Sequence, residues 1–208
     1  MKKIALFLFL FLFIFLAVLY QMEGIQQMDN AVVKGAEDFR TEPFNFFFLT
    51  VSDIGSIKVE FPIMIFASIV LLLFRKFLPA IFLWGTFYSI RFINDELKDL
   101  FHRERPSFDA LIDAAHYSFP SGHAMNSTAF YGFLCYLVLS FTSSKQRSRK
   151  WWIGITVILI GLIGMSRIYL GVHYLVDVLA GFSAGMVWLL VIIKVYEMIK
   201  STKLDYLR

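Results

Sequence analysis

Apolar residues along this chain gather into long runs instead of alternating with polar residues. Six runs approach or reach the length of a membrane-crossing helix, at 4–20, 57–74, 77–94, 123–141, 152–170 and 174–196. A helix needs about 20 predominantly apolar residues to cross the hydrocarbon core of a bilayer. The pattern therefore predicts an all-α polytopic membrane protein, a bundle of six transmembrane helices that forms a single domain over residues 1–208.

The first run could also belong to a secretory signal peptide, because it follows the basic start Met-Lys-Lys. However, the run is longer than the apolar region of a typical signal peptide, and the residues after it, AVLYQMEG, contain no A-x-A cleavage site. We therefore expect an uncleaved first helix.

Composition agrees with this reading, since 58% of the residues are hydrophobic and 24 are Phe. The single cysteine, Cys135, excludes an intrachain disulfide and a thiolate metal cluster, and we expect it inside a helix. The net charge of +4 is explained by membrane orientation, so it does not require a nucleic-acid partner.

The distribution of charge predicts the orientation of the spans. Six spans place both termini on one side of the membrane, and the segments on that side hold twelve bases and two acids, against 8 bases and 14 acids elsewhere. Because Lys and Arg accumulate on the cytoplasmic side, both termini are expected in the cytoplasm. The inside bases are Lys2, Lys3, Arg75, Lys76, Lys145, Arg147, Arg149, Lys150, Lys194, Lys200, Lys203 and Arg208, and the inside acids are Glu197 and Asp205.

Polar sequence on the opposite, outer side lies in segments 21–56 and 95–119, with a short turn around Gly171. Within the first segment, MDNAVVKGAEDFR, residues 28–40, has helical spacing and is typical of an amphipathic helix on a membrane surface. We therefore expect an additional extracytoplasmic helical segment.

Two cations stand at the outer end of the third span, in Lys98-x6-Arg105-Pro106. Seven residues are about two helical turns, so we expect both cations on one face of a helix. A membrane-flanking helix with scattered charges has the same pattern, and this motif alone defines no site.

The segment Pro120-Ser121-Gly122-His123 lies where an outer loop enters the fourth span. Proline suits a first helical turn, serine and glycine are common at helix starts, and glycine lets a ligand approach the backbone. Free N–H groups and the helix dipole make such a start an anion site, with His123 at the same mouth. A plain helix cap beside an interfacial histidine is the alternative.

A third motif, Ser166-Arg167-x5-His173-x3-Asp177, joins the fifth and sixth spans. An arginine in apolar surroundings costs roughly 2.5–3.5 kcal/mol on insertion scales, so Arg167 requires a partner or a ligand. His173 and Asp177 stand i,i+4, a spacing that lets a carboxylate hold one imidazole nitrogen and leave the other basic. A histidine–aspartate pair that serves only helix packing is the alternative.

Together the motifs bring three cations, two histidines and one aspartate to one side of the membrane. Cations around a helix start form a cradle for a phosphoryl group, and two histidines supply a nucleophile and a proton donor. No cluster of carboxylates indicates a metal, and no cofactor is expected. The residues alone do not assign the attacking histidine, although Asp177 favours His173.

The three motifs, complete and in order between residues 98 and 177, resemble those of the type 2 phosphatidic acid phosphatase superfamily. The compact six-span form is most similar to the bacterial phosphatidylglycerophosphatase B-like members. The resemblance implies that His173 forms a phosphohistidine, that Asp177 orients it, and that His123 protonates the leaving oxygen and then activates water. It also implies that the phosphate is bound by Lys98, Arg105, Arg167, Ser121 and the Gly122 backbone.

The resemblance further implies a metal-independent phosphatase of the bacterial cytoplasmic membrane, with its active site on the outer side. Phosphatidylglycerol phosphate is the expected substrate and phosphatidic acid a possible further one, while undecaprenyl diphosphate is the alternative. A lipid or anion transporter would need polar residues through the depth of the spans, which are scarce here. A vanadium-dependent haloperoxidase, with a related pocket, is soluble.

Three features remain outside this assignment. Gly181-x3-Gly185 is a small-x3-small pattern, for which close packing inside the bundle is favoured over a dimer contact. His102 and His116 match no motif and are expected to have loop or interfacial roles. Glu104 can tune the adjacent Arg105 or be solvated. The oligomeric state is left open.

Overall fold

The computed structural model describes residues 2–142 and 146–205, and this part of the chain is helical, with no strand. Lys145 and Arg208, two of the bases assigned to the cytoplasmic side, lie outside the described residues. The helices are α1 (Lys2–Leu19), α2 (Glu23–Asp38), α3 (Glu42–Ile54), α4 (Ile57–Leu73), α5 (Phe77–Phe101), α6 (Gly122–Phe141), α7 (Gln146–Tyr169) and α8 (Leu175–Asp205). The prediction of an all-α protein is therefore confirmed.

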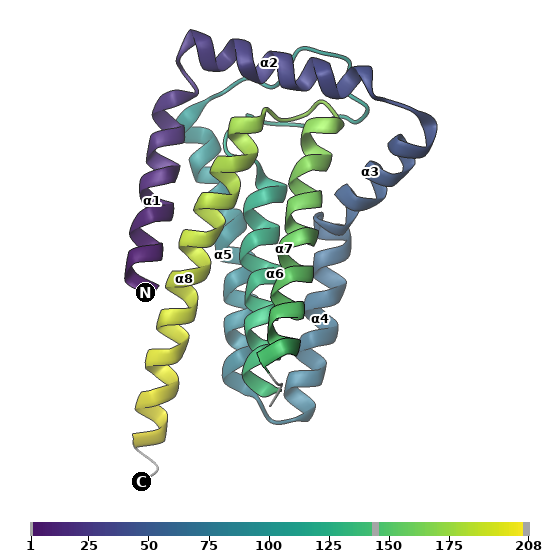
Figure 1. The fold of residues 1–208 in the computed structure, drawn as a ribbon. Coiled ribbons are helices and arrows are strands. Elements are labelled where there is room, and N and C mark those ends of the chain that lie inside the picture. Colours follow the sequence, from purple (N-terminus) through teal and green to yellow (C-terminus); the bar gives the residue numbers. More distant parts are fainter. Residues whose placement is uncertain (1, 143–145, 206–208) are drawn as a thin grey trace.

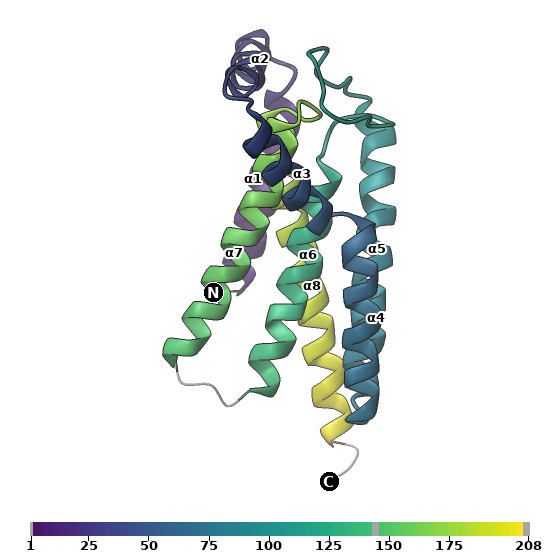
Figure 2. The ribbon, with the colours of Figure 1, turned by 90° about the vertical axis from the view of Figure 1, so that its right-hand side faces the viewer.

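Helix α6 lies at the centre of a bundle, where it packs against α5, α7 and α8 (Figures 1 and 2). Helix α4 pairs with α5, and α1 pairs with α8. The core between these helices is rich in aromatic rings, and Phe87, Phe130 and Phe133 are completely buried. Helix α2 lies across one end of the bundle, and both chain ends point toward the other end (Figure 1).

Helices α6, α7 and α8 are each long and apolar enough to cross a membrane. Two bent pairs, α1 with α2 at 96° and α3 with α4 at 44°, raise the number of candidate spans to five. The chain is thus a multi-pass membrane protein, whereas the number of six spans stays a prediction. Helix α5 has the length of a span, but its second half carries several charged residues between 91 and 99.

The outer segment 21–56 is more ordered than the sequence indicated, because it forms two helices, α2 and α3. The amphipathic helix expected at 28–40 is confirmed within α2, although it begins five residues earlier, at Glu23. Its inward side includes Asp29 and Val33, which are both completely buried. Helix α3 was not predicted as a separate element, because its aromatic-rich sequence is too short to be detected as a span.

The predicted end of the third span, Asn94, is seven residues too early, since α5 continues to Phe101. The added turns contain Glu, Leu and Lys, good helix formers whose charge ends an apolar run but not a helix. The helix stops at His102, which adopts a left-handed conformation with φ 50° and donates its N–H to the Lys98 carbonyl. His102 is therefore a helix cap at the start of a loop, which agrees with the loop role expected of a histidine that matches no motif position.

The Gly181-x3-Gly185 pattern places α8 in close contact with α6. A Cβ atom on Gly181 would lie 2.6 Å from the Ser121 carbonyl oxygen, and one on Gly185 would lie 2.5 Å from the Met125 carbonyl oxygen. Both contacts are too short for any side chain, so the glycines allow the two helices to approach. The prediction of packing inside the bundle is confirmed.

Candidate active site

Four helix ends meet beneath α2, and each carries one part of the predicted constellation. Lys98 lies in the last turn of α5, Gly122 begins α6, Arg167 lies in the last turn of α7, and Asp177 lies in the first turn of α8. Electrostatic interactions link His123 to His173 and to the three cations Lys98, Arg105 and Arg167. The fold therefore gathers the predicted residues at one end of the bundle.

The two cations of the first motif reach the site from different local structures, which their spacing did not predict. Lys98 is helical, but α5 ends at Phe101 and Arg105 lies in the irregular segment that follows. The expectation that both cations share one face of a helix is therefore wrong. The left-handed cap at His102 turns the chain, so that Arg105 approaches the site from the loop.

The second motif also begins differently from the prediction. Pro120 is not in the first helical turn: it follows a cis peptide bond, and Ser121 is the N-cap of α6. The Ser121 N–H donates to the Asp177 carbonyl oxygen at 3.0 Å, while the buried Ser121 hydroxyl has no hydrogen-bond partner. A Cβ atom on Gly122 would lie 2.7 Å from the Asn94 amide oxygen, so a larger residue there would have to displace the Asn94 side chain.

The third motif holds a buried histidine–aspartate pair. His173 stands in the turn before α8 and not on the helix, yet its Nδ1 lies 3.5 Å from Asp177 Oδ2. The side chain of Asp177 is fully buried, and its Oδ2 also accepts the Tyr174 N–H at 2.9 Å. The i,i+4 spacing therefore brought the two side chains together, although a turn supplies the first of them.

The other nitrogen of the His173 ring faces a cation. One N–H group of Arg105 lies 3.2 Å from His173 Nε2 and also donates to the Val172 carbonyl oxygen at 2.7 Å. An arginine can only donate, so this contact makes Nε2 the acceptor and leaves the ring proton on Nδ1, toward Asp177. Remaining Arg105 N–H groups bind carbonyl oxygens of the loop, at Ala115, His116 and Tyr117.

The surroundings of His173 favour the neutral form of its ring. Burial lowers the pKa of His173 well below its usual range, and the positive charges of Arg105, Arg167 and Lys98 lower that pKa further. Each of these influences disfavours the charged imidazolium. A neutral imidazole with its lone pair on Nε2 has the protonation state that nucleophilic attack requires.

Arg167 is buried in the site and only partly paired. One of its terminal N–H groups donates to the hydroxyl of Ser52 on α3, and its Nε has no hydrogen-bond partner. A buried, unpaired N–H of a guanidinium is costly unless a ligand uses it. Arg167 is therefore placed to receive an anion, as its position in an apolar run indicated.

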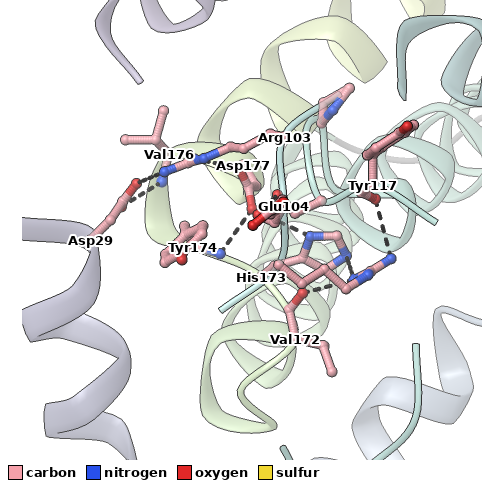
Figure 3. A network of polar contacts seen from close by, with 12 residues as sticks. Asp29, Arg103, Glu104, Tyr117, Val172, His173, Tyr174, Val176 and Asp177 are labelled. Atoms are coloured by element: carbon pink, nitrogen blue, oxygen red, sulfur yellow. Dashed lines mark hydrogen bonds and ion pairs between the residues drawn. The ribbon is translucent and has the colours of Figure 1, made fainter. Parts of the chain in front are cut away.

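Two residues that the sequence analysis missed complete the network around Asp177. Arg103 donates to Asp177 Oδ1 at 2.5 Å and to Asp29 Oδ2 at 2.7 Å, as Figure 3 shows. Arg103 lies inside the first motif, between its two recognised cations. The available signal for Asp29 was its i,i+4 spacing with Val33, which puts a carboxylate on the inward face of an amphipathic helix.

Among residues 2–142 and 146–205, no group of three or more His, Cys, Asp or Glu side chains is arranged to hold a metal ion. The metal-independent chemistry expected from the motifs stays a prediction. The chemical groups that the site does contain are a buried histidine whose Nδ1 lies 3.5 Å from an aspartate oxygen without a hydrogen bond, a second histidine, three cations and an unpaired hydroxyl.

Comparison with known proteins agrees with the geometry, since the model of the PAP2 superfamily matches residues 69–201. The chain belongs to the PAP2 superfamily. It is 30% identical to phosphatidylglycerophosphatase B of Bacillus subtilis over 185 residues, which cover 89% of this chain and 90% of that protein. This is the superfamily that the three motifs resembled.

A solved structure and one more relative agree with this placement. A crystal structure described as a transmembrane PAP2 type phosphatidylglycerolphosphate phosphatase from Bacillus subtilis superposes with a TM-score of 0.88, at 30% identity, and covers 95% of this chain and 97% of that one. An Escherichia coli protein provisionally assigned as an undecaprenyl-diphosphatase is 33% identical over 102 residues, which cover 46% of each chain.

Proposed function

We propose that this PAP2 superfamily protein is a membrane lipid phosphatase that removes the terminal phosphate from phosphatidylglycerol phosphate. The observation that carries the proposal is the buried His173–Asp177 pair, with the unprotonated Nε2 of His173 facing the Arg105 guanidinium. The relative that matches over most of its length acts, by its name, on this lipid phosphate. A lipid substrate also suits a site at the end of a membrane bundle, because its tails can stay in the bilayer.

In the proposed first step, His173 Nε2 attacks phosphorus, the N–P bond forms and the P–O bond to the glycerol oxygen breaks. His123 donates its proton to that oxygen, so the lipid leaves as an alcohol. Asp177 stabilises the positive charge that develops on the His173 ring. Lys98, Arg105 and Arg167 neutralise the phosphoryl oxygens, which the Ser121 hydroxyl and the Gly122 N–H also bind.

In the second step, His123 takes a proton from a water molecule, whose oxygen attacks the phosphorus of the phosphohistidine. The N–P bond breaks, His173 recovers its lone pair, and inorganic phosphate leaves. The proposed phosphate-binding role of Ser121 and Arg167 is supported by the unpaired Ser121 hydroxyl and the unpaired Arg167 Nε. Both are buried donors whose hydrogen bonds a phosphate would complete.

We further propose that the site faces the outside of the cytoplasmic membrane, with both termini in the cytoplasm. Arg75, Lys76, Arg147 and Arg149 lie at the ends of helices opposite the site, where the positive-inside rule expects cytoplasm. Reporter fusions within residues 107–118 and after the last residue should report opposite compartments. A cytoplasmic signal from the loop would contradict this orientation.

Phosphate release by purified protein from a panel of lipid phosphates tests the activity. Phosphatidylglycerol phosphate should be the preferred substrate, and His173→Ala should release no phosphate. A preference for undecaprenyl diphosphate would favour the alternative, which the Escherichia coli relative supports. The absence of phosphate release from every lipid in the panel would refute the proposal.

A further inference from the structure

Helix α2 inserts a carboxylate into the interior of the protein. Asp29 is completely buried, its Oδ2 accepts from Arg103 at 2.7 Å, and its Oδ1 accepts from the Val176 N–H at 3.2 Å. This residue lies outside the region that matches the family model, 69–201. A buried carboxylate costs several kcal/mol unless it is paired, and Arg103 supplies the pair for Asp29.

The guanidinium of Arg103 is fixed on every side. It bridges Asp29 and Asp177 through two different N–H groups, and it is only 8% exposed. Its plane also lies against two aromatic rings, with centroids 4.2 Å away for Tyr174 and 5.1 Å away for Tyr20. A side chain held in this way cannot swing toward a ligand, and it differs in this respect from Arg167, whose Nε is unpaired.

We propose that Asp29 and Arg103 are positioning residues that set the Asp177 carboxylate, and through it the nucleophilic ring of His173. Surface helix α2 is then a part of the catalytic apparatus and not only a cover over it. The proposal rests on the proposed phosphohistidine mechanism, because it assigns these residues a task within that mechanism.

Asp177 must present one oxygen to His173 Nδ1, and a carboxylate turns freely unless its other oxygen is held. Arg103 holds Oδ1 while the Tyr174 N–H holds Oδ2, which leaves Oδ2 at 3.5 Å from Nδ1 (Figure 3). Asp29 fixes Arg103 in turn. It also divides the positive charge of Arg103 between two carboxylates, so that Asp177 keeps enough negative charge to stabilise an imidazolium.

The role predicts a specific kinetic signature. We assign neither residue a contact with the phosphoryl group, because both are paired with protein atoms, so their loss should lower kcat and leave KM unchanged. Loss of a phosphate ligand such as Arg167 should raise KM as well. If the two residues had a purely structural role, their loss would leave KM unchanged, and kcat calculated per folded molecule would also be unchanged.

The test compares Asp29→Asn, Arg103→Lys and Arg103→Gln with the matched control Asp38→Asn, which removes an exposed carboxylate from the same helix. Phosphate release from phosphatidylglycerol phosphate in detergent micelles is measured per folded molecule, with the folded fraction taken from thermal unfolding. Arg103→Gln should lower kcat about 10–100-fold, the range typical of losing a partner that orients a functional group. Asp29→Asn should lower kcat about 3–10-fold, since asparagine keeps one acceptor oxygen. The loss of kcat in Arg103→Lys should lie between the losses in Asp29→Asn and Arg103→Gln.

Arg103→Gln leaves two buried carboxylates without their cation, and this variant can fail to fold. If Arg103→Gln does not fold, the isosteric variant Asp29→Asn tests the proposal by its kcat and KM. Where both fold, the double variant Asp29→Asn/Arg103→Gln should lose no more activity than Arg103→Gln alone, because Asp29 acts only through Arg103. A double variant that shows the full product of both losses would overturn the relay.

The outcomes separate this proposal from the function on which it rests. If wild-type protein releases phosphate, His173→Ala does not, and Asp29→Asn and Arg103→Gln both keep the wild-type kcat, the positioning role alone is wrong. A raised KM with unchanged kcat in Arg103→Gln would make Arg103 a substrate ligand and overturn the proposal. If the wild-type protein cleaves no lipid phosphate, both the proposed phosphatase function and the positioning role of Asp29 and Arg103 are wrong.

Discussion

The substitution Gly181→Ala tests how the close packing of α8 against the start of α6 supports the site. The added methyl group would lie 2.6 Å from the Ser121 carbonyl oxygen, 2.9 Å from the Ala124 Cβ and 3.2 Å from the Met125 N. All three atoms are backbone atoms or a Cβ, so none can move by a side-chain rotation. The strain must therefore move α8 away from the start of α6.

The size of the effect follows from these distances. The shortest contact must open by roughly 0.8 Å or more to reach ordinary van der Waals separation. Overpacking of this kind costs about 1–3 kcal/mol, against which alanine gains up to about 1 kcal/mol over glycine in a helix. We expect a net loss of about 1–2 kcal/mol of stability. Phosphate release per folded molecule should also fall, by about tenfold or more, because the displaced residue Ser121 belongs to the proposed phosphate cradle.

Thermal unfolding and phosphate release in the same detergent measure the two effects. The matched control is Gly161→Ala on α7, where an added Cβ meets no atom within 4 Å. The control should keep full activity and be equal to or more stable than the wild type. A Gly181→Ala protein with wild-type stability and kcat would show that the close approach of α8 to α6 is not needed, and would refute this reasoning.

Three further predictions concern the chemistry. With nitrophenyl phosphate, His123→Ala should keep part of the first step and accumulate acid-labile, base-stable phosphate on the protein, whereas His173→Ala should accumulate none; a phosphoenzyme in His173→Ala would reverse the two roles. EDTA should leave turnover unchanged and vanadate should inhibit it, while reversible loss of activity restored by Mg²⁺ would contradict a metal-free mechanism. The pKa of His173 should lie below 6.5 in the substrate-free protein because burial and three cations disfavour its charged form, so the ring stays neutral at mildly acidic pH. Histidine NMR, with the His173 signal identified by its absence from His173→Ala, measures this pKa, and a value above 6.5 would contradict the described surroundings.

Much of the fold was accessible from the sequence because a bilayer imposes a simple rule. Apolar runs placed the cores of α1 and α4 through α8, since a helix in lipid must satisfy its backbone internally. The amphipathic spacing of residues 28–40 predicted most of α2 in the same way. The last two turns of α5 escaped this rule, because charged helix formers continue a helix without extending its apolar run.

Some features of the site could likewise be predicted from local sequence patterns, whereas others depend on tertiary contacts. Motif spacing by itself determined that His173 and Asp177 would meet and that Arg167 would need a partner, because these follow from turns of one chain and from the cost of burying a charge. Only the tertiary structure decided that Arg105 approaches from a loop, and that Arg103 ties Asp177 to Asp29, 148 residues earlier in the chain. No periodicity encodes a contact between a surface helix and a loop, since it exists only once α2 has folded across the end of the bundle.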